Sequence, residues 1–252
     1  MNDDYAALAP IYDRIGLSGF AETITPLLLG YAQSNDWVGR RVIDLGCGTG
    51  GSVRWLARHG YNTTAVDLSP AMLSVAQKSI QTEGLGLRWL QGDIRAITDL
   101  HDIDLALALD TLSDLNSLRD LEMVFSAVIK VLNPGKLFVF DLHTLEGLAE
   151  RGRTTTFALD DDDLTIVDTH HFDYERQASV NEYRVFERSG DLWRRWNATR
   201  TRRGFPIQVV SALLVRSGFG IMTTLNERMQ PLNAVNGRVN RVIFYAQKPE
   251  TE

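Results

Sequence analysis

The chain has 252 residues, of which 44% are hydrophobic and 23% charged, and its net charge is -6. This composition supports a full hydrophobic core, and the acidic balance argues against sequence-independent binding to nucleic acid. A single cysteine excludes an internal disulfide framework, and no apolar run reaches the roughly 18 residues that span a membrane. Because the start of the chain also lacks a basic leader region, we expect a cytoplasmic protein that acts on a small molecule.

Residues 3–34 predict two helices ahead of the first strand. A break near Gly16 separates them, and in the second helix the apolar residues from Phe20 to Leu28 recur at helical spacing. We expect residues 1–35 to form a helical lid ahead of the sheet.

Residues 42–51, with the sequence VIDLGCGTGG, predict a buried strand, a tight turn and the start of a helix. Glycine tolerates positive φ and lets a ligand approach the backbone, and a helix that begins at about Gly51 presents unpaired N–H groups to that ligand. The glycines satisfy the dinucleotide fingerprint G-x-G-x-x-G, but Asp44 would repel a pyrophosphate and attract a cation. We therefore predict a nucleotide cofactor with a positive charge and disfavour a dinucleotide-dependent oxidoreductase.

Strand and helix alternate beyond this turn, which is typical of a doubly wound α/β fold. The apolar run at 103–110 indicates a strand that is covered on both faces of a parallel sheet. Ser69 is a suitable N-cap, and Pro70 a suitable first residue, for a helix at 70–81. Further helices are expected at 51–59 and 118–132, and further strands at 62–68, 85–94 and 136–143.

The pattern changes in residues 152–203, where Thr, Val, aromatic and turn residues predict three to five antiparallel strands. A helix that begins at Pro206 and two final strands then follow. We therefore expect an α/β core in residues 36–151 and 204–252 that is interrupted by an antiparallel β insert.

The string DLGCGTG at residues 44–50, with Asp67 at the end of the next strand, resembles the first motif of class I S-adenosylmethionine-dependent methyltransferases. Nearly the whole chain is similar to bacterial small-molecule members of that family, including aminosugar N-methyltransferases. The resemblance implies S-adenosylmethionine as the cofactor and a Rossmann-like methyltransferase fold, with a seven-stranded, mostly parallel sheet that an antiparallel hairpin completes. In that family the late β insert normally shapes the substrate pocket, so the motifs leave the acceptor open.

The resemblance also assigns residues to the cofactor. The glycines of the turn would face its methionine part, Asp67 its ribose hydroxyls, and Asp93 with Ile94 its adenine. Tyr12 would place its ring near the cofactor, although an ordinary amphipathic contact fits Tyr12 as well, and a turn cap fits Asp93. Within the turn, Cys47 is interpreted as a small packing residue rather than a nucleophile. The expected cofactor-binding residues are Tyr12, Asp44, Gly46, Cys47, Gly48, Asp67, Leu68, Met72, Gly92, Asp93, Ile94 and Asp110.

Methyl transfer from a sulfonium is an in-line displacement, so alignment can supply much of the acceleration and a base is optional. His143 is the first candidate for a general base, because it ends the strand that contains Asp141 and histidine titrates near neutral pH. Asp110 is the second. Each also has a structural interpretation, as a capping or loop histidine and as an aspartate that orients the backbone or the cofactor.

The most basic stretch of the chain is residues 193–203. Alternation along a strand places four of its side chains on one face, Arg194, Trp196, Arg200 and Arg202. Such a face is either solvated, with partial balance from the acidic residues 160–163, or able to stack a base and bind phosphate. The second interpretation favours a phosphorylated or nucleotide-linked acceptor over bulk nucleic acid.

His170 and His171 are adjacent in the insert. Adjacent residues of a strand face opposite sides of the sheet, so these two imidazoles are poorly placed to share a metal ion. No Cys/His spacing in the chain resembles a zinc site, and we expect no metal.

The leading hypothesis is a methyltransferase that acts on N or O of a small molecule, as a monomer or homodimer and without a membrane partner. An RNA or protein methyltransferase is an alternative that only the basic stretch supports. A non-catalytic regulatory protein that binds adenosylmethionine is a second alternative, since the cofactor motifs would be intact in both cases.

Overall fold

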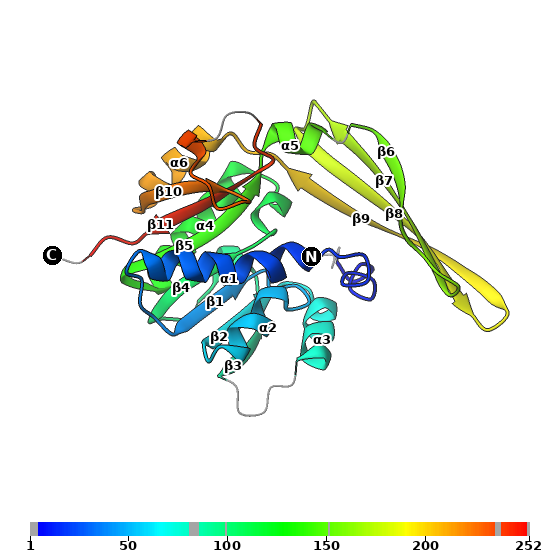
Figure 1. The fold of residues 1–252 in the computed structure, drawn as a ribbon, viewed down its shortest axis with the longest axis horizontal. Helices are drawn as coiled ribbons and strands as arrows, with labels where there is room; N and C mark the ends of the chain where they lie inside the picture. The colour runs from blue at the N-terminus through cyan, green and yellow to red at the C-terminus, as the bar shows by residue number, and fades with distance from the viewer. Residues whose placement is uncertain (1–4, 81–85, 99, 151, 235–237, 251–252) are drawn as a thin grey trace.

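The computed structural model describes residues 5–80, 86–98, 100–150, 152–234 and 238–250, which form one seven-stranded and one four-stranded sheet (Figure 1). The strands of the large sheet are β1 (Arg41–Leu45), β2 (Asn62–Asp67), β3 (Leu87–Gln91), β4 (Ile103–Ala108), β5 (Leu132–His143), β10 (Gly220–Asn226) and β11 (Arg241–Gln247). They lie in the order β10-β11-β5-β4-β1-β2-β3.

Neighbouring strands of the large sheet are parallel except at β11, which is antiparallel to both β10 and β5. The expected doubly wound, mostly parallel seven-stranded sheet with a final antiparallel hairpin is therefore confirmed. Asp44 pairs with Ala65 of β2 and Leu107 of β4, so the carboxyl ends of these strands meet at one edge of the sheet. Open α/β sheets bind their ligands at this edge.

Helices cover both faces of the large sheet. On the face covered by α4, Phe125 packs against Phe138 and Phe140 of β5, with ring centroids 6.0 and 5.4 Å apart. Full burial of such a side chain stabilises the fold by roughly 1.5–3 kcal/mol. None of the described helices is long and apolar enough to cross a membrane. One face carries α1 (Gly19–Ser34), α2 (Gly51–Arg58) and α3 (Pro70–Ser79), and the other carries α4 (Leu118–Val131) and α6 (Ile207–Arg216).

The start of α3 follows the sequence prediction. The hydroxyl oxygen of Ser69 accepts a hydrogen bond from the N–H of Met72 at 3.2 Å, and Pro70 is the first helical residue. The start of β5 differs from the sequence prediction, because this strand begins at Leu132 rather than at residue 136. A register shift against β4, together with Gly135 at φ +71°, accommodates the extra residues in the strand.

The insert forms the four-stranded sheet, within the predicted number of strands. Its strands are antiparallel and lie in the order of the chain: β6 (Thr154–Asp160), β7 (Leu164–Asp173), β8 (Ala178–Ser189) and β9 (Leu192–Arg203). The long β8–β9 hairpin extends away from the large sheet (Figure 1). One face of the insert is apolar and packs on the N-terminal segment, where Tyr183 and Val185 join a cluster with Leu8, Ile11 and Tyr12.

Residues 5–18 form a series of turns, so the prediction of a first helix is wrong. Pro10 has no N–H for a helical hydrogen bond, and Gly16 takes a left-handed φ of +74°. The apolar spacing that suggested a helix instead buries Leu8 and Ile11 against the insert. The second predicted helix is present as α1.

Candidate active site

A cavity of about 290 Å³ lies at the carboxyl edge of the large sheet. Every expected cofactor-binding residue except Gly92 lines it. It also has a lining that the sequence did not predict, which includes Tyr5, Thr111 and Asp114. His143, the first candidate for a base, is not among the lining residues.

The glycine turn after β1 is held by the end of β2. The N–H groups of Gly46 and Cys47 donate to the carbonyl oxygen of Val66 at 2.8 and 3.0 Å. Gly46 has a φ of +69°, and a Cβ at this position would lie 2.3 Å from Cγ2 of Thr111. Gly48 also has a positive φ of +55°, but its missing Cβ would meet open space. Gly46 is therefore needed for packing, whereas Gly48 leaves the backbone open to the cavity.

Asp67 organises this turn as well as lining the cavity. Its carboxylate accepts from the N–H of Gly48 at 2.8 Å and from the N–H of Ser69 at 2.9 Å. Asp67 therefore shapes the turn and also lines the cavity at the place where the ribose hydroxyls are expected.

Asp44 is a buried acid beside the turn, with 2% of its surface exposed. Among the described residues its Oδ2 has no hydrogen-bond partner. Burial, and next the charge of Asp67, raise the pKa of Asp44 to about 7, against the effect of a hydrogen bond from Ser52. A buried acceptor without a partner that faces a cavity is suited to a cation. The residues present therefore fit the ammonium group of S-adenosylmethionine.

Asp93 is fixed by Arg95. The guanidinium donates to the Asp93 carboxylate at 2.6 Å and to Asp120 at 2.7 Å, and this interaction lowers the pKa of Asp93. The carboxylate also accepts from the N–H of Arg95 at 2.9 Å, which makes Asp93 the cap of a short 3₁₀ turn, Ile94–Ala96. Asp93 is thus a turn cap that also lines the cavity.

The N-terminal segment contacts the glycine turn directly. The hydroxyl of Thr49 donates to the carboxylate of Asp13 at 2.5 Å. Tyr12 lines the cavity, and burial raises the pKa of its hydroxyl to about 12. The rings of Tyr12 and Tyr5 meet edge to face, 6.3 Å between centroids, so the two tyrosines form one aromatic wall.

Asp110 follows the end of β4 at a left-handed φ of +53°. Its N–H donates to the carboxylate of Asp141 at 2.7 Å, and its own carboxylate accepts from Arg200 at 2.8 Å and from Arg241 at 2.9 Å. Burial alone would raise the pKa of Asp110, but the two arginines outweigh it and hold that pKa well below its ordinary value. A carboxylate with so low a pKa is a poor proton acceptor.

His143 lies at the end of β5, behind Asp110. Its Nε2 lies 2.9 Å from Nη2 of Arg241, 3.3 Å from Nη1 of Arg202 and 3.2 Å from the Asp110 carboxylate. Burial lowers the pKa of His143 to about 4, so the ring is neutral at pH 7, and the tautomer decides whether Nε2 donates to Asp110 or accepts from the arginines. A role as general base stays a prediction, and the contacts of the ring fit a structural role.

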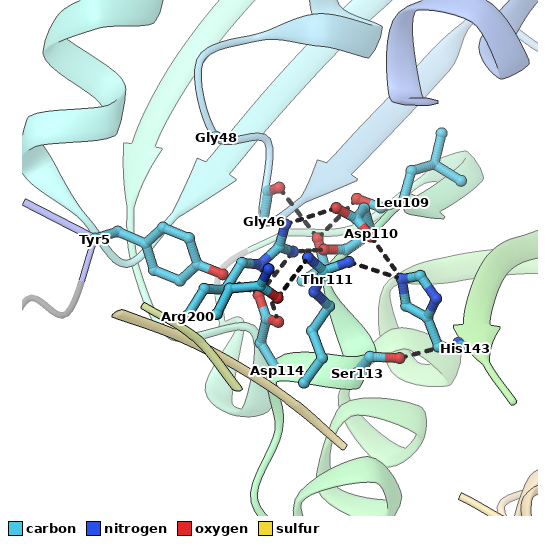
Figure 2. Close-up of polar contacts among 12 residues, drawn as sticks. Tyr5, Gly46, Gly48, Leu109, Asp110, Thr111, Ser113, Asp114, His143 and Arg200 are labelled. Carbon is cyan, nitrogen blue, oxygen red and sulfur yellow. Dashed lines mark hydrogen bonds and ion pairs between the residues drawn. The ribbon is translucent and has the colours of Figure 1, made fainter. Parts of the chain in front are cut away.

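Arg200 is the main departure from the sequence analysis. Its side chain is 1% exposed and pairs with Asp110 and Asp114 (Figure 2). The expectation of a solvated or phosphate-binding face is therefore wrong at this position, although Arg194 of the same strand is 71% exposed. Asp110 and Asp114, two acids close together after the end of β4, indicate that a cationic side chain lies nearby. The sequence does not indicate which arginine supplies it.

His170 is also buried, and its two ring nitrogens are bonded within the insert. Nδ1 lies 2.9 Å from the carbonyl oxygen of Gly152, and Nε2 lies 2.8 Å from the hydroxyl of Ser179. Within the described ranges, no group of three or more His, Cys, Asp or Glu side chains is placed to hold a metal ion.

Comparison with known proteins finds similar methyltransferases. Residues 42–135 match the model of a family described as a methyltransferase domain. Over 245 residues the chain is 29% identical to the putative methyltransferase YqeM of Bacillus subtilis strain 168, and the match covers 92% of this chain and 97% of that protein.

Several solved structures share the fold. An S-adenosylmethionine-dependent methyltransferase from Clostridium acetobutylicum superposes with a TM-score of 0.82 at 23% identity, over 97% of this chain and 99% of that chain. CalS10, an amino pentose methyltransferase from Micromonospora echinaspora, superposes with a TM-score of 0.68 at 17% identity, over 90% of this chain and 91% of that chain. The domain match, the nearly full-length relative and the fold agree: residues 42–135 match a methyltransferase domain, and the chain shares the fold of S-adenosylmethionine-dependent methyltransferases.

Proposed function

We propose that this enzyme transfers a methyl group from S-adenosylmethionine to the nitrogen of a small amine. The charge of the cavity carries the proposal. Its lining includes one arginine, Arg95, and five aspartates: Asp44, Asp67, Asp93, Asp110 and Asp114. Arg200 and Arg241 pair with these acids from outside the lining, so five acids face three arginines. The remaining excess of negative charge attracts an amine or ammonium group and opposes an anionic acceptor.

The direction of charge movement also favours nitrogen. The bound cofactor supplies a methyl group on a positively charged sulfur, and a neutral amine becomes a cation as it accepts that group. Asp110 and Asp114 would stabilise the new positive charge, because preorganised opposite charges act where charge develops. Tyr5 and Tyr12 would orient the acceptor from the aromatic wall.

An oxygen acceptor would require more of the protein. A hydroxyl must lose a proton near the moment of transfer, and the two candidate bases are poorly suited to take it. His143 does not line the cavity, and Asp110 has a lowered pKa. An amine that enters as its free base needs no protein base, so alignment can be the main source of acceleration.

The alternatives lose support at Arg200. A phosphorylated or nucleotide-linked acceptor, and RNA, were favoured only by a free basic face, and Arg200 is buried in ion pairs. A purely regulatory protein would not need the lining that Tyr5 and Asp114 add beyond the cofactor residues. The similar structure CalS10 is described as an amino pentose methyltransferase, which agrees with an amine acceptor.

We also propose roles for the parts of the chain outside the core. Residues 1–35 act as a lid, because Tyr12 lines the cavity and Asp13 bonds to the glycine turn. Residues 152–203 support that lid from the side away from the cofactor, through the cluster that joins Tyr183 to Leu8.

The experiment is methyl transfer from cofactor with a labelled methyl group to a panel of small amines, each paired with its hydroxyl analogue. We expect label in amines only, at a rate that rises with pH as the free-base fraction of the amine rises. A metabolite extract, total RNA and total protein serve as further acceptors. Label confined to hydroxyl compounds, RNA or protein would overturn the proposal.

A further inference from the structure

Arg200 comes from β9 of the insert, yet its guanidinium lies among residues of the core (Figure 2). Nη1 donates to Oδ2 of Asp110 at 2.8 Å, and Nη2 donates to the carbonyl oxygen of the same residue at 2.7 Å. Nη2 and Nε also donate to the two carboxylate oxygens of Asp114, at 3.2 and 3.4 Å. One buried side chain thus holds two acids and a backbone carbonyl.

The first set of contacts leads from Arg200 to the cofactor turn. Both backbone polar groups of Asp110 are hydrogen-bonded, since its carbonyl oxygen accepts from Arg200 and its N–H donates to Asp141. This fixes the next residue, Thr111, whose hydroxyl proton is shared between the carbonyl oxygens of Gly46 at 3.2 Å and Leu109 at 3.0 Å. Thr111 also fills the space where Gly46 lacks a side chain. A displacement of Asp110 would therefore reach the turn that faces the cofactor.

The second set of contacts leads to the lid. Asp114 accepts a short hydrogen bond from the hydroxyl of Tyr5 as well as the bonds from Arg200. The ring of Tyr5 lies beneath the guanidinium, 5.8 Å from its central carbon to the ring centroid, and packs against Tyr12. Tyr5, Tyr12 and Asp114 all line the cavity. A displacement of Asp114 would therefore reach the aromatic wall.

We propose that Arg200 is a positioning residue for methyl transfer, which keeps the cofactor turn and the aromatic wall in alignment by holding Asp110 and Asp114 together. It is the insert's contribution to the active site, made through buried contacts and without touching the acceptor. This inference rests on the proposed function, because it assumes that an acceptor binds between the turn and the wall.

The chemistry of the side chain supports this role. Arginine presents five N–H donors in a rigid planar fork, and Arg200 uses all three of its nitrogens on Asp110 and Asp114. A lysine would carry the same charge as a point, on a flexible stem, and could not hold both acids and the carbonyl at once. A positive charge alone would therefore not hold Asp110 and Asp114 in this arrangement.

The test compares Arg200→Lys with Arg194→Lys, the same change at an exposed arginine of the same strand. The first readout is hydrogen–deuterium exchange of the protein without an acceptor. We expect Arg200→Lys to speed amide exchange by roughly 10-fold in residues 5–17 and in residues 44–51, with α4 and α6 unchanged. Arg194→Lys should match the wild type throughout.

A third variant separates the two sets of contacts. Asp114→Asn weakens the bonds of Asp114 with Tyr5 and Arg200 but leaves the bonds of Arg200 with Asp110, so exchange should rise in residues 5–17 but stay unchanged in residues 44–51. This variant also covers the case in which Arg200→Lys does not fold. Equal acceleration in every segment, or none in either segment, would overturn the inference, since the first result describes general destabilisation and the second describes no coupling.

Turnover supplies the second readout once an amine acceptor is known. At a temperature where circular dichroism shows a fully folded protein, Arg200→Lys should lower kcat by roughly 10-fold or more, because misalignment raises the barrier. Arg194→Lys should keep the wild-type kcat. An active wild type with an equally active Arg200→Lys variant would refute the positioning role alone. A wild type that methylates no amine would refute the proposed function, whatever the exchange experiment shows.

Discussion

A hydrogen bond joins Asp67, at the end of β2, to Gly48, in the turn after β1: the Gly48 N–H donates to the Asp67 carboxylate at 2.8 Å. The acid expected to bind the ribose therefore also shapes the turn that faces the methionine part of the cofactor. Mutations at either residue will combine an effect on the ligand with an effect on the turn, and the variants must separate the two.

Asp67→Asn is a cleaner test of ribose binding than Asp67→Ala. The amide keeps an acceptor oxygen for one of the two backbone N–H groups but loses the charge, so cofactor affinity should fall by about 1.5–3 kcal/mol with a smaller loss of unfolding free energy than in Asp67→Ala. Asp67→Ala should also lower stability, because it leaves two backbone N–H groups without their acceptor. Calorimetry with S-adenosylhomocysteine measures the first effect, and unchanged affinity in both variants would remove the ribose role.

Gly46 and Gly48 should respond to substitution in opposite ways. Gly46→Ala places a Cβ against Thr111 at a positive φ, so we expect a loss of stability of about 1–3 kcal/mol. Gly48→Val also carries the strain of a positive φ, but it meets no neighbouring atom and points a branched side chain into open cavity, so it should lose cofactor binding at temperatures where it is still folded. Thermal unfolding and calorimetry distinguish these outcomes, and normal binding by Gly48→Val would show that the turn does not face the ligand.

Cofactor binding should depend on pH through Asp44. The pKa of this acid is about 7 in the free protein, and its ionised form attracts the cationic ligand. Affinity should therefore weaken as pH falls below about 7, approaching tenfold per pH unit, until the acid is fully protonated in the complex as well. Asp44→Asn should bind weakly at every pH with a flat profile, and a wild-type affinity that is level from about pH 5 to 8 would contradict the assignment.

The same group should affect stability in the opposite sense. In the unfolded chain Asp44 loses its proton near its ordinary pKa of 3.8, whereas the folded protein keeps it up to about pH 7. Between these values the folded state binds more protons, so the free energy of unfolding should fall as pH rises. Denaturant unfolding without ligand measures this slope, and Asp44→Asn should reduce it.

His143→Asn tests whether proton transfer matters. With a pKa of about 4 and an Nε2 that faces two arginines, the ring should not titrate between about pH 6 and 9. We expect this variant to lose less than tenfold in turnover with an unshifted pH profile, and Tyr12→Ala to lose more because it opens the aromatic wall. A 100-fold loss in His143→Asn with a changed pH profile would instead restore the histidine as the base.

The core was predictable because its signals are local. Strand, glycine turn and helix follow one another within a few residues at 42–51, and Ser69 and Pro70 mark a helix start by their own chemistry. Parallel strands then bring Asp44, Asp67 and Asp110 to one edge without further information. Most of the cofactor lining follows from these rules.

The remaining parts were missed where distant residues decide the outcome. The N-terminal segment has helical spacing, but Pro10 and Gly16 interrupt a helix, and its apolar side chains pack on the distant insert instead. Arg200 pairs with Asp114 and Asp110, which are 86 and 90 residues away. Strand alternation predicts the face of the strand on which Arg200 lies, but not the residues that cover that face. The pKa of His143 is likewise lowered first by burial and then by the charge of Arg241, which is 98 residues away.

The pairing of β5 with β11 has a consequence for how the protein is made. Arg241 lies directly opposite His143, yet 98 residues separate them in the chain. During synthesis one edge of β5 therefore stays unpaired while the whole insert emerges from the ribosome, because its neighbour β11 is translated later. Closure over so long a separation is slow, and the exposed edge is a site for wrong pairing. The need of this protein for chaperones should therefore depend on how quickly β11 pairs with β5. Mutations that weaken β11 should lower the yield of folded enzyme before they lower its activity.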